Sequence, residues 1–233
     1  MSLLLHQLRF ERVLFRRNPS AAFFNFVLPL VLLLLVASVF ADDDEELEVL
    51  IPGIAGMSIM ATTFTALAFN MTFLREQGIL KRIRGTPIPA QSYLGGLVGS
   101  AVVNAVVQVV LVFAIGKIAY GVDLPEEPAA VLVYAVVGVA AFAALGIAFS
   151  HAIPNFDAAG AYTNAVFLPL IFISGVFYSA DDLPPALELI GGTLPLKHVI
   201  DGLAGEGFGA GLAIVVAWGA LGAILAVRYF RWD

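Results

Sequence analysis

The amino-acid sequence predicts an all-α integral membrane protein that crosses the bilayer six times. Its mean hydropathy is +0.94 and only 13% of its residues are charged, which places it outside the range of soluble domains. A bilayer core about 30 Å thick requires roughly 20 apolar residues per helix. Six runs of about this length lie near 21–41, 49–72, 93–116, 129–150, 161–179 and 210–229. We therefore expect one polytopic domain covering residues 1–233.

The distribution of basic residues predicts the orientation of these six spans. Lys and Arg in short loops favour the cytoplasmic side. With the N-terminus in the cytoplasm, ten basic residues fall inside, whereas Lys117 and Lys197 fall outside. The acidic residues follow the opposite pattern, and six of them lie within 42–48, the first outer loop. Both termini are therefore expected in the cytoplasm.

Residues 3–17 precede the first span and have the pattern of an amphipathic helix. Three arginines lie on one side of a helical wheel and leucines and phenylalanines on the other, which predicts a helix lying on the membrane surface. Asn18 and Pro19 are suited to begin the next helix. A disordered basic tail held near anionic lipid is the alternative. A cleaved signal peptide over 1–41 is less compatible with the long, patterned basic region.

The third span carries a stripe of polar side chains. Ser100, Asn104 and Gln108 are four residues apart and share one helical face. Within hydrocarbon an amide needs a hydrogen-bond partner or water. The stripe therefore faces either another helix or a hydrated path, and the sequence leaves both alternatives open.

The outer segment 182–205, between spans five and six, is rich in Leu, Ile and Pro and predicts two short helices. Pro184 and Pro185 are suited to begin the first, and Gly191 with Gly192 to end it. A second helix would run from Pro195 to about residue 204. We expect this segment to cover the outer end of the bundle.

The sequence lacks the motifs expected of an ATPase, a metal site or an ion-coupled carrier. There is no phosphate-binding G-x-x-x-x-G-K-[ST] motif, so we expect no ATPase activity, and no cofactor, on this chain. His6, His151 and His198 lie in separate regions, so we expect no shared metal site. No span has an acidic or basic residue at its centre, although ion-coupled carriers generally need one. The energy for transport would then come from another chain.

Residues 75–84, between spans two and three, concentrate positive charge on the predicted cytoplasmic side. On a helical wheel Ile79, Leu80 and Ile83 share an arc with Glu76, while the basic residues occupy the rest. The pattern predicts a short amphipathic helix ended by Gly85 and followed by two prolines. One interpretation is that the charges only set topology and contact lipid headgroups. The short length, the apolar ridge and the rigid exit favour docking of another protein.

Three segments resemble one known family. "RNPSAAFFNFVLPLVLLLL", "LREQGILKRIRGTPIPAQSYLGG" and "LPLKHVIDGL" are similar to the permease subunits of ABC exporters of the ABC-2 type, a group that includes drug-resistance and polysaccharide-export permeases. The resemblance implies that 75–84 is a coupling helix that docks in a groove of a separate ATP-binding subunit, and that 3–17 is a connecting helix. Residues 205–207 (Gly-Glu-Gly) depart from the basic residue that many members carry there.

The resemblance implies a half-transporter in the plasma (inner) membrane of a prokaryote. Two copies of this chain would pair around a path for amphiphilic cargo, which could be drug-like, a lipid or a glycan. Each copy would be moved by one ATP-binding subunit, which holds ATP and Mg. The permease itself would contact membrane lipid, and we expect no nucleic acid among its partners. The expected coupling residues are Arg75, Glu76, Ile79, Leu80, Lys81, Arg82, Ile83 and Arg84.

A lining of hydroxyl, amide and aromatic side chains suits amphiphilic cargo, and spans two and five supply such residues. The expected pathway residues are Thr62, Thr65, Phe69, Asn164, Phe167, Phe172 and Phe177. Two other classes of function stay open. A stand-alone secondary transporter or channel would move solute without ATP or a partner. The second open class is a membrane scaffold or a membrane-embedded enzyme. An enzyme would need converging His, Asp or Glu residues, a pattern that the sequence lacks.

Overall fold

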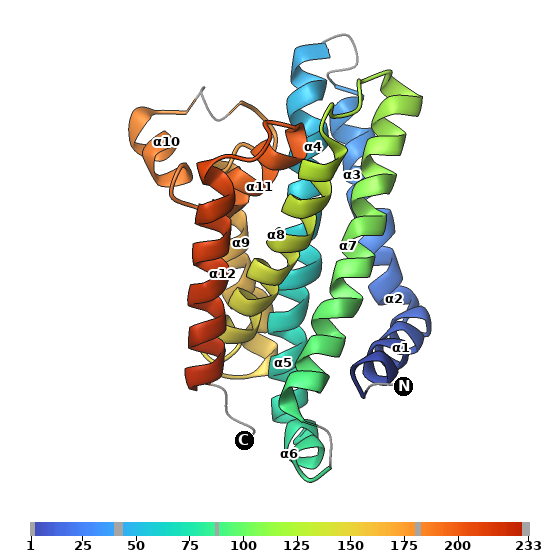
Figure 1. The fold of residues 1–233 in the computed structure, drawn as a ribbon, viewed down its shortest axis with the longest axis vertical. Helices are drawn as coiled ribbons and strands as arrows, with labels where there is room; N and C mark the ends of the chain where they lie inside the picture. The colour runs from blue at the N-terminus through green and yellow to red at the C-terminus, as the bar shows by residue number, and fades with distance from the viewer. Residues whose placement is uncertain (1–2, 40–43, 87–88, 180–182, 230–233) are drawn as a thin grey trace.

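The computed structural model describes residues 3–39, 44–86, 89–179 and 183–229, and their regular structure is entirely helical. Long helices run side by side along one axis, with short helices at both ends (Figure 1). The elements are α1 (Leu3–Arg16), α2 (Pro19–Ala22), η1 (Phe23–Val27), α3 (Leu28–Ala37), α4 (Asp44–Met60), η2 (Ala61–Thr65), α5 (Ala66–Glu76), α6 (Ile79–Arg84), α7 (Ala90–Tyr120), α8 (Pro128–Phe149), α9 (Phe156–Ile173), α10 (Pro185–Gly191), α11 (Pro195–Ala204) and α12 (Ala210–Tyr229), where η marks a π-helical turn.

Among the described residues, five helices are long and apolar enough to cross a membrane. They correspond to the second to sixth predicted spans and cover Glu45–Glu76, Ser92–Tyr120, Pro128–Phe149, Phe156–Ile173 and Ala210–Tyr229. In place of the predicted span 21–41, the described residues contain a shorter apolar helix, Phe23–Ala37. At 1.5 Å per residue it is about 22 Å long, less than the hydrocarbon thickness of about 30 Å. A sixth crossing therefore stays a prediction.

The two ends of the bundle differ in charge. One end of the bundle holds the end of α5 with Arg75, α6 with Lys81 and Arg82, and the end of α12 with Arg228 (Figure 1), and we call this the basic end. The start of α4, the α7–α8 connection, α10 and α11 lie at the opposite end (Figure 1), and we call this the acidic end. The charge asymmetry of the sequence is thus also an asymmetry of the folded chain.

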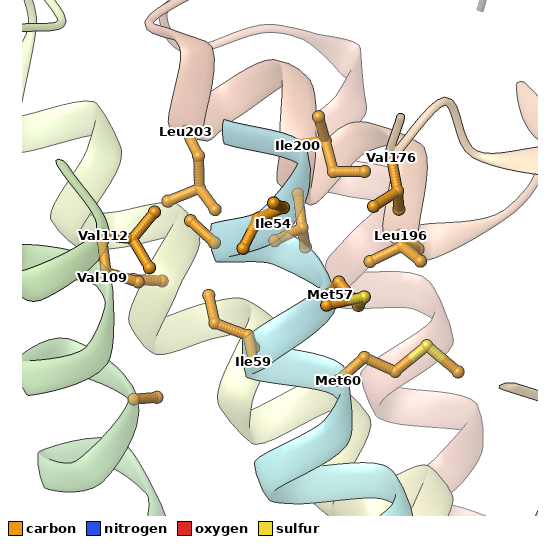
Figure 2. Packing of buried hydrophobic residues seen from close by; sticks show 14 of the residues in the cluster. Ile54, Met57, Ile59, Met60, Val109, Val112, Val176, Leu196, Ile200 and Leu203 are labelled. Carbon is orange, nitrogen blue, oxygen red and sulfur yellow. The ribbon is translucent and has the colours of Figure 1, made fainter. Parts of the chain in front are cut away.

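A continuous helix made of α4, η2 and α5 forms the centre of the bundle and connects the two ends; we call it the shaft. It covers Glu45–Glu76, and most of its apolar stretch is buried by the rest of the chain. Figure 2 shows its side chains Ile54 and Met57 near Leu196 and Ile200 of α11. A Cβ at Gly53 would lie 2.1 Å from the Val176 carbonyl oxygen, so only glycine allows this close approach.

The N-terminal helix α1 packs along α7 near the basic end. Its Arg12 donates a hydrogen bond to the Asn104 side-chain oxygen at 3.0 Å. At Asn104, one of the three residues of the polar stripe, the side chain therefore faces another helix, α1. The buried Gln108 amide has no hydrogen-bond partner in the described part of the chain.

The two short helices predicted at 182–205 form as α10 and α11, although residue 182 lies outside the described residues. Prolines begin both helices, at Pro185 and Pro195, because a proline at the first helical position costs no backbone hydrogen bond. α11 buries Leu196, Val199 and Leu203 against α4, α8 and α12. It therefore covers the acidic end of the bundle.

Candidate functional site

A sharp reversal of the chain at the basic end forms an elbow, which we define as residues 75–86. α5 ends at Glu76, and Gly78 then adopts φ 66°, a left-handed conformation that glycine occupies without steric cost. α6 follows for six residues and ends at Gly85. A short helix thus lies within the predicted range and ends at Gly85, but it starts at Ile79 rather than at residue 75. A coupling role for this helix stays a prediction.

Two side chains of the elbow bind the connection between α8 and α9. The Arg75 guanidinium donates hydrogen bonds to the carbonyl oxygens of Ser150 at 3.1 Å and Ile153 at 2.6 Å. The Phe156 backbone N–H donates to the Glu76 carboxylate at 2.6 Å, so this anion lies at the positive N-terminal end of α9. We call these three hydrogen bonds the clamp. They bind the elbow to the connection that leads into α9.

The apolar side of α6 packs inside its own chain. Leu80 is only 2% exposed and belongs to a buried cluster with Met71, Tyr93 and Leu97, and Ile83 packs against the same cluster. The sequence predicts that this ridge docks in the groove of a partner, and that docking stays a prediction. Within this chain Leu80 fixes α6 to the bundle, because the reversal at Gly78 turns this face of the helix inwards.

The remaining predicted coupling residues differ in accessibility. Lys81 and Arg82 are exposed, and Ile79 is half-buried. The side chain of Arg84 lies outside the described part of the structure. The surface that the elbow offers to another molecule is therefore mainly cationic rather than apolar.

The seven predicted pathway residues do not converge on one cavity. Those of the shaft are largely enclosed by their own chain: the buried Thr62 hydroxyl donates to the Ser58 carbonyl at 2.9 Å, and the half-buried Phe69 packs edge-on against Phe156. The Thr65 hydroxyl is buried and has no hydrogen-bond partner within the described residues.

The predicted pathway residues beyond the shaft come from α9 and the segment after it. Asn164 and Phe172 are exposed, whereas Phe167 and Phe177 are half-buried. The rings of Phe172 and Phe177 lie 6.1 Å apart. Within a single chain, Thr62 is therefore buried and Asn164 and Phe172 are exposed, while Phe167 and Phe177 pack against the core.

A groove of about 920 Å³ lies among the described residues, and none of the predicted pathway residues lines it. Phe142 and Phe149 of α8 line it, together with residues of α9, such as Val166, and of α12, such as Trp218. Arg75 and His151 line it as well, so it reaches the clamp. These residues come from five segments of the chain, and no local pattern in the sequence indicates that they meet.

The clamp also uses residues that sequence reasoning missed. Ser150, Ile153 and Phe156 take part through backbone atoms, so their side chains give no signal of the contact. The only available signal was the unusual placement of an Arg-Glu pair at the end of an apolar span.

Most of the chain matches one known protein family. Residues 3–206 match the family model described as "ABC-2 type transporter". The chain is 39% identical over 69 residues to nodulation protein J of Rhizobium leguminosarum bv. viciae, which covers 30% of this chain and 26% of that protein. It is 23% identical over 156 residues to the inner membrane transport permease YadH of Escherichia coli K12, which covers 67% of this chain and 60% of that permease.

The similarity to these two proteins is partial: the aligned region spans about a quarter of nodulation protein J and three fifths of YadH. The family model, by contrast, covers α1 to α11 and the elbow, which is most of the chain. The family model covers most of the chain, and the chain folds as a bundle of helices long and apolar enough to cross a membrane. The chain belongs to the ABC-2 type transporter family.

Proposed function

We propose that this chain is the permease subunit of an ATP-driven exporter of amphiphilic cargo. A separate ATP-binding cassette subunit, which holds ATP and Mg, docks on the elbow at the basic end. The basic end faces the cytoplasm, because Lys and Arg are retained on that side. The membrane is the inner membrane of a prokaryote, which is where the name of the relative YadH places that permease.

The observation that carries this proposal is the clamp. Arg75 and Glu76 end the shaft and also bind the connection into α9. A displacement of the elbow by a partner therefore moves the shaft and α9 together. This is what an exporter needs if ATP-driven closure at one end is to change the shape of a pathway inside the membrane.

The cationic surface of the elbow provides the docking contact. Lys81 and Arg82 are exposed on α6, while Leu80 fixes the helix to the bundle. A helix fixed on its apolar side and charged on the other transmits force, because it cannot rotate freely when pushed. Acidic side chains of the ATP-binding subunit complement this surface.

A second copy of the chain completes the pathway. α9 packs on α5, and only 17% of its most apolar stretch is buried within one chain. The exposed Asn164 on this helix is polar, which is costly against lipid and favourable in a hydrated or protein-lined path. Pairing two copies through α9 would place Asn164 and Phe172 of both copies along a shared path.

The proposal is tested by reversing charge on the elbow. ATP-binding cassette subunits of the source organism are co-expressed with wild type to identify one that binds, and that subunit is then co-expressed with Lys81→Glu/Arg82→Glu and with Arg228→Glu. Arg228 is the matched control, an exposed arginine at the same end that lies on α12 outside the elbow. We expect the elbow variant to bind the subunit at least about tenfold more weakly, a loss of about 1.4 kcal/mol, and the control to bind normally.

Two results would contradict the proposal. One is equal binding of the ATP-binding subunit to the elbow variant and to wild type. The other is solute transport by the purified chain alone in vesicles without ATP, which would support a stand-alone secondary transporter or channel.

A further inference from the structure

The groove of about 920 Å³ lies along the side of the bundle between α8, α9 and α12, and we call it the side groove. Two residues that line it, Trp218 and Tyr229, are eleven residues apart on α12. At 1.5 Å per residue this part of the groove is about 16 Å long. One leaflet supplies half of a hydrocarbon core that is about 30 Å thick. The side groove therefore has the length of a single leaflet.

The two ends of the side groove differ in chemistry. Arg75 lines the end that lies at the basic end of the bundle. Leu194 and Pro195, in the connection from α10 into α11, line the other end. There the indole N–H of Trp218 donates a hydrogen bond to the Thr193 carbonyl at 2.8 Å. The groove thus has one cationic end and one apolar end that is bordered by this connection.

The walls between these ends are apolar and only partly buried. Half-buried side chains line the groove on three helices: Leu145 and Phe149 of α8, Val166 of α9, and Leu225 of α12. Only 17% of the most apolar stretch of α9 is buried within the chain, and the same is true of α12. Because its walls belong to the two least covered spans, an acyl chain can enter the groove from the surrounding bilayer.

The Arg75 guanidinium has no ion-pair partner in the described part of the chain. Its two hydrogen bonds go to the neutral carbonyl oxygens of Ser150 and Ile153, and the ion pairs found there do not include it. No Asp or Glu among the described residues lines the groove. A guanidinium carries five N–H donors, so further donors remain for a ligand. A half-buried cation is costly without an anion, which this end of the groove is suited to receive.

We propose that the side groove binds an anionic phospholipid, with one acyl chain along its apolar walls and the phosphate on the Arg75 guanidinium. Basic pockets between transmembrane helices bind anionic lipid headgroups, and arginine binds phosphate through paired N–H donors. The lipid comes from the leaflet at the basic end. The inference goes beyond the proposed function, because it assigns a resident lipid rather than cargo and needs no ATP-binding subunit.

The test measures quenching of Trp218 fluorescence by phospholipids that carry bromine on their acyl chains. The full chain carries Trp232→Phe, so that Trp218 is its only tryptophan, and is held in nanodiscs. Brominated phosphatidylglycerol or brominated phosphatidylcholine is mixed in increasing amounts into phosphatidylcholine without bromine. We expect the anionic lipid to bind about tenfold more tightly than the zwitterionic one, a difference of about 1.4 kcal/mol. Equal binding of the two lipids overturns the inference.

The headgroup contact is tested with a matched pair of variants. Arg75→Gln should remove the preference for the anionic lipid, because its phosphate loses a charged donor. Arg82→Gln removes the same charge from an exposed position of the elbow that does not line the groove, and should keep the preference. Loss of the preference in both variants would show general attraction to the basic end, and loss in neither would show that Arg75 holds no headgroup. Either result overturns the inference.

Because Arg75 also belongs to the clamp, a second pair of variants blocks the groove without changing the clamp. Val166→Phe places a larger side chain in the groove, whereas Leu168→Phe makes a similar change at an exposed position of α9 that does not line it. Val166→Phe should weaken binding of the anionic lipid at least about tenfold, or about 1.4 kcal/mol, and Leu168→Phe should leave it unchanged. Unchanged binding in Val166→Phe, or equal weakening in both variants, refutes a lipid in the side groove.

Two further measurements exclude other occupants. Excess inorganic phosphate should leave the quenching unchanged, because burial of the acyl chain contributes to binding; displacement of the lipid would show a site for free phosphate. Nanodiscs that hold two copies of the chain should show the same lipid preference as those that hold one. Loss of the preference on pairing would assign the groove to the second copy and overturn the inference.

Discussion

Removing the Arg75 guanidinium should release the α8–α9 connection from the elbow. Arg75→Gln removes the charged donor of two hydrogen bonds, to the carbonyls of Ser150 and Ile153. A hydrogen bond to a charged group contributes about 1.5–3 kcal/mol net. Because Arg75 is half-buried, the lower value applies to each bond, and the clamp loses about 3 kcal/mol. At about 1.4 kcal/mol per factor of ten, the connection should open about 100-fold more often.

Amide hydrogen exchange measures this opening directly. The Ile153 N–H bonds the Ser150 carbonyl and the Phe156 N–H bonds Glu76, so both amides report on the connection. In nanodiscs both should exchange about 100-fold faster in Arg75→Gln than in wild type. Arg82→Gln removes the same charge from an exposed position in the same elbow and should change neither rate. Unchanged exchange in Arg75→Gln, or equal acceleration in both variants, would refute the clamp.

Three further predictions concern packing and charge. Leu80→Ala should lower the free energy of unfolding by about 2–5 kcal/mol, and the half-buried Ile79→Ala by less, as measured by thermal unfolding in nanodiscs. Gly53→Ala should cost about 1–3 kcal/mol in the same assay, because its Cβ would meet a backbone oxygen at 2.1 Å, whereas Gly209→Ala, in open space, should not. Burial raises the pKa of Glu11 despite a hydrogen bond from Gln7, so α1 should dock most tightly at low pH and loosen as pH rises through that raised pKa. A spin label on a cysteine introduced near the middle of α1 should report this change, and Glu11→Gln should abolish it.

The amphipathic pattern predicts one helix over 75–84, whereas in the structure α5 ends at Glu76 and a separate helix covers Ile79–Arg84. Period and charge show which residues share a face, but not whether that face meets a partner or the chain itself. Leu80 is buried because Gly78 reverses the chain and Tyr93 and Leu97 of α7 lie beneath it. The expected pathway residues likewise share a chemical type but not a location, since Thr62 is buried in the fold and Phe172 is exposed.

The sequence by itself determined the helices, their approximate ends, the family and the asymmetry of charge. These properties are local or additive: apolar runs set the long helices, Pro185 and Pro195 begin short ones, and charges are simply counted along the chain. Only the tertiary structure brought Arg75 to a carbonyl 78 residues away, and Glu76 to an amide 80 residues away. It also gathered six carboxylates around one cavity, those of Glu45, Glu48, Asp123, Glu126, Asp201 and Glu206. Such contacts depend on how helices pack, and many packings are compatible with the same pattern of apolar and charged residues.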